Sequence, residues 1–220
     1  MSGPRREPDL SAEADPATTL EEADIAFSEQ VTAERGNPVV KALGTVGELG
    51  DQPPLYLLSA SVLAAGLLTG RGRIASAGAQ MLLSVSIATV LKTIVKRSVS
   101  RTRPHVLLDE GVYEVRPHGP DVGPWHSFPS GHTAGSVAAA RALARTIPEA
   151  ALPAYAAATA IAAVQVPTAH HFASDVLAGA AIGLAADAIA ERAVRLAPRL
   201  VGVEPDQLPP RGRAWRTDES

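Results

Sequence analysis

Four cationic side chains fall within an eight-residue segment that Pro104 follows: Lys96, Arg97, Arg101 and Arg103. Lys96 and Arg103 are seven residues apart, so a helix running through both would place them on one face, two turns apart. Two cations directed into one space suit a phosphate group, whose charge and oxygens match such donors. Pro104 favours the end of a helix at this point. The alternative interpretation is a positively charged anchor beside a membrane helix.

A second segment, Phe128–Thr133, precedes a stretch of helical composition and contains the run Ser130-Gly131-His132. The start of a helix has unpaired backbone N–H groups and binds anions for that reason. A hydroxyl and an imidazole at the same place add a hydrogen-bond donor and a group that titrates near neutral pH. The run indicates an anion site, unless Ser130 only caps the helix and His132 is incidental.

His171 and Asp175 are four residues apart, at the start of a further apolar stretch. On a helix this spacing brings the two side chains together. A carboxylate that holds one imidazole nitrogen fixes the tautomer and leaves the other nitrogen free to act as a nucleophile. Alone, the pair has a second interpretation, an ordinary aspartate in the first turn of a helix.

Taken in order, the three segments resemble the signature of the type 2 phosphatidic acid phosphatase superfamily. They are Lys96-x6-Arg103-Pro104, Pro129-Ser130-Gly131-His132 and His171-x3-Asp175, within a region from Gln80 to Ala190. That superfamily includes membrane lipid phosphatases, soluble bacterial acid phosphatases and vanadium haloperoxidases. The resemblance implies an all-α fold, a multi-helix bundle of the bacterial membrane-bound type.

The resemblance also implies a reaction, the hydrolysis of a phosphoester through a phosphohistidine without a metal or other cofactor. His171 would attack phosphorus while Asp175 orients its imidazole, and His132 would protonate the leaving oxygen and later activate water. The implied phosphate-binding residues are Lys96, Arg103, Ser130 and Gly131. The implied substrate is a phosphomonoester or diphosphate of a lipid, and the implied partner is a membrane.

The third motif departs from the family pattern at one place. The family has a Ser-Arg pair with its arginine six residues before the nucleophile, where this chain has Val164 and Gln165. Gln165 donates hydrogen bonds but carries no charge, so one phosphate-binding cation is missing. Losing a charge-assisted contact weakens phosphate binding by roughly 1.5–3 kcal/mol. Arg101, Arg97 or His170 could compensate; the alternative is a catalytically weak or inactive relative that binds lipid phosphate.

The composition favours helices and excludes several classes of protein. The 220 residues are 46% hydrophobic and 4% aromatic, with 20 Lys and Arg against 23 Asp and Glu and no cysteine. Without cysteine there are no disulfides, thiolate metal sites or cysteine nucleophiles. The net charge of -3 excludes a histone-like polycation, and the short basic run without interleaved aromatics disfavours nucleic-acid binding.

Five apolar stretches predict the helices that must position the motifs. They are Leu55–Thr69, Ile74–Leu91, Thr133–Thr146, Ala150–Ala169 and Val176–Ala186. Some approach the roughly 17–25 residues that cross a bilayer, and a soluble alanine-rich bundle is the alternative to a membrane-embedded one. With a poor sixth element from the N-terminal region, the prediction is five or six membrane-associated helices.

The predicted organisation has four parts. Residues 1–18 are acidic and predicted to be disordered. Residues 19–50 are predicted to form two amphipathic, interfacial helices, Thr19–Arg35, capped by Thr19, and Pro38–Leu49. Residues 51–200 form the catalytic bundle, and residues 201–220 are predicted to be a flexible tail. A long segment rich in Pro, Gly and His, Lys96–Gly131, joins the second and third bundle helices.

The order of the helices predicts an orientation. The three motifs lie at the end of the second bundle helix and at the starts of the third and fifth, which share one side in an up-and-down bundle. The arginines that fall on the opposite side are Arg71, Arg73, Arg145, Arg192, Arg195 and Arg199. By the positive-inside tendency that side is cytoplasmic, which predicts a multi-pass protein of the cell membrane with an outward-facing active site. The identity of the lipid phosphate and the oligomeric state are not determined by these patterns.

Two other enzyme classes use similar residues. A vanadate-dependent haloperoxidase would bind vanadate through His171, but normally on a longer soluble chain. A metal hydrolase would draw its ligands from the six histidines, whose spacing matches no recurring zinc pattern. These histidines are His105, His118, His126, His132, His170 and His171.

Overall fold

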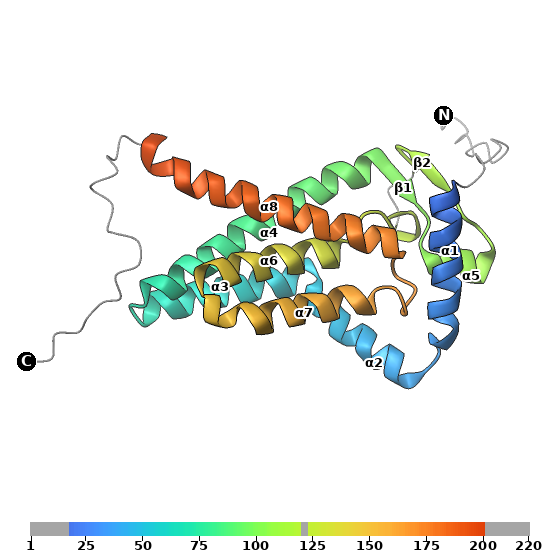
Figure 1. Ribbon diagram of the computed structural model, residues 1–220, viewed down its shortest axis with the longest axis horizontal. Coiled ribbons are helices and arrows are strands. Elements are labelled where there is room, and N and C mark those ends of the chain that lie inside the picture. The colour runs from blue at the N-terminus through green and yellow to red at the C-terminus, as the bar shows by residue number, and fades with distance from the viewer. Residues whose placement is uncertain (1–17, 120–122, 201–220) are drawn as a thin grey trace, which may run out of the picture.

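The computed structural model describes residues 18–119 and 123–200 of the chain, so the predicted disordered head, apart from Thr18, and the predicted tail lie outside the described residues. Helices dominate, as predicted (Figure 1). The α-helices are α1 (Thr19–Val31), α2 (Pro38–Gly47), α3 (Gln52–Leu68), α4 (Gly72–Ser98), α5 (Pro104–Glu110), α6 (Gly131–Thr146), α7 (Ala151–Val164) and α8 (Ala173–Leu200). Short 3-10 helices are η1 (Thr32–Glu34), η2 (Glu48–Gly50), η3 (Gly123–Trp125) and η4 (Pro148–Ala150), and the strands are β1 (Val99–Arg101) and β2 (Val115–Pro117).

Five helices, α3, α4, α6, α7 and α8, form the bundle, and α6 packs against α4, α7 and α8 (Figure 1). Small side chains make this packing close, since they let helix backbones approach one another. On α6, Ala134, Ala138 and Ala142 are completely buried. At the contact between α3 and α4, a Cβ on Gly78 would lie 2.2 Å from the backbone nitrogen of Leu63.

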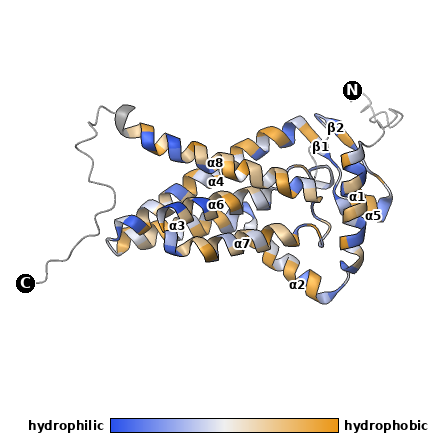
Figure 2. Cartoon of the chain, in the orientation of Figure 1, coloured by the Kyte–Doolittle hydropathy of each residue, from blue (hydrophilic) through white to orange (hydrophobic). Residues whose placement is uncertain are grey.

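The bundle helices contain many apolar residues, interspersed with polar ones (Figure 2). Large hydrophobic side chains such as Leu68, Leu152 and Leu177 are largely exposed. Helix α4 and residues Ala173–Ala197 of α8 are long and apolar enough to cross a bilayer, and α3 is a shorter apolar helix. These surfaces suit contact with lipid tails better than contact with water.

The interior of the bundle, by contrast, holds charge. Asp187 of α8 is completely buried, accepts a hydrogen bond from Ser84 at 3.1 Å and pairs with Arg145 at 2.8 Å. Ionisable residues of membrane helices face the bundle interior and pair there. Because its charge is neutralised in this way, Asp187 does not end the helix, and α8 continues well beyond the predicted end at Ala186.

The N-terminal helices α1 and α2 lie at one end of the bundle (Figure 1). The N-cap of α1 is Thr18, one residue before the predicted cap at Thr19. Thr18 and Glu21 form a reciprocal capping box, in which the Thr18 N–H donates to Glu21 Oε2 at 2.7 Å. Asp24 and Ser28 of α1 are buried, so this helix contacts the rest of the protein through polar side chains.

The long segment between the second and third bundle helices is structured. Helix α4 ends at Ser98, and β1 then pairs antiparallel with β2, with Arg101 opposite Val115. Arg103 lies beyond the strand, as the N-cap of α5. The prediction that Lys96 and Arg103 share one helix face was therefore wrong, because the chain becomes extended between them.

Candidate active site

The predicted nucleophile, His171, is buried in the turn between α7 and α8. Its Nδ1 lies 2.7 Å from the carbonyl oxygen of Ser127. Because a carbonyl only accepts, Nδ1 carries the proton and the neutral ring keeps its lone pair on Nε2. Burial lowers the pKa of His171 to about 4, so the ring is neutral near pH 7. The imidazole is held in the tautomer that an Nε2 nucleophile requires.

Asp175 acts on His171 from a longer distance than predicted. Its Oδ2 lies 3.8 Å from Nδ1 of His171, and the Nδ1–H donates its hydrogen bond to the Ser127 carbonyl and not to this carboxylate. Asp175 itself accepts hydrogen bonds from Ser127 Oγ at 2.5 Å, the Phe172 N–H at 2.9 Å and Arg101 at 2.8 Å. The carboxylate is thus rigidly held, and its charge can stabilise a positive imidazole.

Arg101 is buried between two carboxylates. Its guanidinium donates to Asp175 and, at 2.9 Å, to Asp24 of α1. It also lies over the ring of Phe172, 3.9 Å from the centroid. Asp24 in turn accepts hydrogen bonds from the backbone and hydroxyl of Ser174. Arg101 is therefore occupied within the protein, and it connects α1 to Asp175 instead of replacing the missing phosphate ligand.

The run Ser130-Gly131-His132 begins α6, as predicted. Ser130 is the N-cap, and its hydroxyl accepts a hydrogen bond from the backbone N–H of Thr133 at 3.4 Å. The backbone N–H of Ser130 donates to the carbonyl oxygen of Asp175 at 3.0 Å. This hydrogen bond ties the N-terminus of α6 to the first turn of α8, so two of the three motifs meet.

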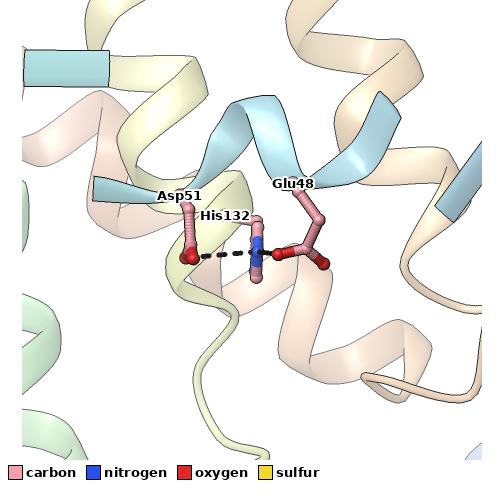
Figure 3. A group of neighbouring side chains, drawn as sticks. All are labelled: Glu48, Asp51 and His132. Atoms are coloured by element: carbon pink, nitrogen blue, oxygen red, sulfur yellow. Dashed lines mark ion pairs between the residues drawn. The ribbon is translucent and has the colours of Figure 1, made fainter. Parts of the chain in front are cut away.

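His132 lies between His171 and two carboxylates. The centroids of the two imidazole rings are 6.2 Å apart. His132 Nε2 lies 3.3 Å from Asp51 Oδ1 and 3.9 Å from Glu48 Oε2 (Figure 3). Burial lowers the pKa of His132, and the charges of Asp51 and Glu48 oppose this shift without reversing it. The ligand atoms of the three side chains lie within 4.8 Å of one another, close enough to hold a cation.

The two predicted phosphate-binding cations come from separate elements. Lys96, in the last turn of α4, donates from Nζ to the carbonyl oxygen of His126 at 2.7 Å. Arg103 is half-buried, and its Nε has no hydrogen-bond partner within residues 18–119 and 123–200. The charge of Arg103 acts on Lys96, His132 and His171. The fold therefore brings both cations close to His171, and Arg103 also close to His132.

Gln165 does not replace the missing arginine. Its Nε2 donates to the carbonyl oxygen of Ile161 at 3.1 Å and lies against Gly47 of α2. Its Oε1 is buried without a partner in the part of the chain that the structure describes. Arg97, one of the suggested replacements, is exposed on α4.

A cavity of about 600 Å³ adjoins these groups. It lies between the α1–α2 connection, α5 and the turn before α8, and its polar lining residues are Arg35, Lys41, Thr45, Glu48, His105, Thr168 and His170. Glu48 also faces His132, and His170 directly precedes His171. The cavity has room for much more than a phosphate group, next to the two histidines.

Several contributors to the site were not predicted, among them Ser127, Asp24 and Asp51. Ser127 holds His171 through a backbone carbonyl, which residue type does not reveal. Asp24 and Asp51 lie in the N-terminal quarter of the chain, far in sequence from the motifs. Only their position in the fold identifies them, since isolated aspartates before or within helices are common.

The chain is similar to several known proteins. The model of the PAP2 superfamily matches residues 77–197. A lipid A 1-phosphatase of Rhizobium etli is 28% identical over 171 residues, which cover 72% of this chain and 73% of that protein. A transmembrane PAP2 type phosphatidylglycerolphosphate phosphatase from Bacillus subtilis has a similar structure, with a TM-score of 0.59 and 22% identity, over 82% of this chain and 88% of that one. LpxE from Aquifex aeolicus has a TM-score of 0.56 and 22% identity, over 76% and 94%. The likeness to both solved structures confirms the predicted all-α bundle.

Proposed function

This chain belongs to the PAP2 superfamily and is a phosphoric ester hydrolase by family, and we propose that it removes a phosphate group from a lipid phosphomonoester or diphosphate through a phosphohistidine. The observation that carries the proposal is the hydrogen bond from His171 Nδ1 to the Ser127 carbonyl at 2.7 Å. It leaves Nε2 unprotonated and available as the nucleophile.

In the first step, Nε2 of His171 attacks phosphorus, and the bond between phosphorus and the leaving oxygen breaks. Protonated His132 gives its proton to that oxygen. Asp175, 3.8 Å from Nδ1, stabilises the positive ring that results. Lys96 and Arg103 offset the negative charge on the phosphoryl oxygens.

In the second step, water cleaves the phosphohistidine. His132, now neutral, takes a proton from the water, whose oxygen attacks phosphorus while the bond to His171 Nε2 breaks. Inorganic phosphate leaves, His171 returns to its neutral form, and His132 is again protonated. Neither step requires a metal ion, so the proposed reaction is metal-independent.

Two features support a lipid substrate. The bundle exposes large apolar side chains along its outer faces and pairs Asp187 inside, as membrane helices do. The cavity beside His170 and Glu48 offers space for the part of the substrate that carries the phosphate. The relatives that resemble this chain include a lipid A 1-phosphatase and a phosphatidylglycerolphosphate phosphatase. A lipid in the bilayer would present its headgroup at the end of the bundle where the site lies.

The same arrangement supports an orientation across the membrane. The candidate site lies at the end of the bundle near α1 and β1 (Figure 1). Arg73 contacts Glu149 and the Thr146 carbonyl at the opposite end, between α3–α4 and α6–α7. The positive-inside tendency, applied to the arginines of that opposite end, supports our proposal that it is cytoplasmic and that the active site of a multi-pass protein faces outward.

The test is phosphate release by detergent-purified protein from a panel of lipid phosphates and diphosphates, with excess chelator. His171→Ala should abolish release and leave no phosphoenzyme to trap by rapid quenching, whereas His118→Ala, another histidine of the same end, should remain active. Release that persists in His171→Ala would refute the phosphohistidine. No release from any lipid would favour a lipid-phosphate-binding protein that is inactive because Gln165 replaces the arginine. Release that the chelator abolishes would favour a metal ion bound by Glu48, Asp51 and His132.

A further inference from the structure

Lys92, a lysine of α4 outside the three motifs, extends its side chain to the N-terminus of α6. It precedes Lys96 by one turn of α4, so the two ammonium groups are on one helix face. A Cβ on Gly131 would lie 2.9 Å from Lys92 Nζ and 3.3 Å from its Cδ. The glycine of the second motif thus leaves the space that the Lys92 side chain fills.

The surroundings of Lys92 leave its charge available. The side chain is half-buried and makes no hydrogen bond or ion pair with the residues at 18–119 and 123–200. The charged groups that face it are Lys96, His132 and Asp51. Lys92 and Lys96 also line a common cavity of about 340 Å³. An unpaired ammonium beside a second cation and a helix N-terminus is poised for an anion.

The position at which the family has an arginine supplies no charge. Gln165 directs its amide N–H to the Ile161 carbonyl, and its only other polar atom is an acceptor oxygen, which repels an anion. Arg101 is occupied by Asp24 and Asp175. Lys92 lies next to the second motif, and no carboxylate of residues 18–119 and 123–200 contacts it directly.

We infer that Lys92 is a phosphate ligand of this enzyme and supplies the positive charge that Gln165 does not. The inference rests on the proposed function, since the phosphate is that of the substrate. The phosphoryl oxygens then contact Lys92, Lys96 and Arg103, so the site has as many cations as the family pattern, in which an arginine stands at the position of Gln165. The competing explanation is a lysine that reaches from the end of α4 toward water or lipid headgroups.

The test compares Lys92→Gln with Arg73→Gln, which removes the same charge from an exposed position at the opposite end of the same helix. We expect Lys92→Gln to raise the inhibition constant of inorganic phosphate and to lower kcat/KM by about ten- to a hundredfold, and Arg73→Gln to change neither by more than about twofold. Lys92→Arg should retain most of the affinity. In Lys92→Gln/Gln165→Arg, the new arginine should recover part of it, which a structural role of Lys92 would not allow.

An unchanged inhibition constant in Lys92→Gln would overturn the inference. A raised inhibition constant that neither Lys92→Arg nor the double variant lowers again would also overturn it, because Lys92 would then act only on the fold. Should wild type release no phosphate from any lipid, the proposed function fails separately. Calorimetric titration of the same variants with inorganic phosphate then decides whether Lys92 binds the anion.

Discussion

Replacing Arg101 by methionine should destabilise the protein by roughly 3–5 kcal/mol, the usual cost of removing one partner from a buried ion pair. Methionine can keep the apolar contact with Phe172 but removes the charge that Asp24 and Asp175 share. Both carboxylates would remain buried, since they are 7% and 0% exposed. Asp175 would keep its hydrogen bonds from Ser127 and the Phe172 N–H, so the cost is that of a lost counterion and not of complete desolvation.

Thermal unfolding of the detergent-solubilised protein measures this effect. At this chain length 1 kcal/mol shifts the midpoint by about 2–4 °C, so we expect a drop of about 6–20 °C. Arg116→Met is the control, because Arg116 pairs with Glu114 while 34% exposed, and such pairs contribute about 0–1 kcal/mol. Adding Asp24→Asn to Arg101→Met should raise the midpoint again, since one stranded charge is removed. An Arg101→Met midpoint within about 4 °C of wild type would refute the reasoning.

Two further predictions concern the reaction rate. Burial lowers the pKa of His171 to about 4, and only its neutral form attacks phosphorus, so kcat/KM should stay high as pH falls and be lost only near pH 4. Initial rates measured across pH test this. A loss of kcat/KM that begins near pH 6.5, the ordinary pKa of histidine, would contradict it. His132→Ala should lower kcat/KM, which reports the first step, by about 10²–10⁴ for an alkyl phosphate but much less for p-nitrophenyl phosphate, because p-nitrophenolate leaves without a proton. Asp51→Asn alters a group 3.3 Å from His132 Nε2 and should show the same selectivity to a smaller degree. Steady-state kinetics on both substrates measure these effects. Equal losses of kcat/KM on the two substrates in His132→Ala would exclude proton donation by His132.

The features predicted correctly depend on neighbours in the chain. Ser130-Gly131-His132 begins α6 because capping satisfies backbone N–H groups of the next few residues. The apolar stretches located the bundle helices because apolar runs longer than about 10–12 residues favour helices over strands. The predicted helix ends were less accurate. Helix α7 ends at Val164, although uncharged residues continue to Ala169, because the chain turns after Val164 and leads to His171.

The amino-acid sequence by itself indicated phosphate chemistry, because three motifs in order resemble those of one family, although each motif alone has a second interpretation. It also determined that the protein is helical. Only the tertiary structure decided which partner each group has. His171 is held by the Ser127 carbonyl, Arg101 is neutralised by carboxylates from α1 and α8, and Lys92 is left unpaired beside Gly131. These contacts join residues distant in sequence, and their strength depends on burial and distance, which no spacing along the chain specifies.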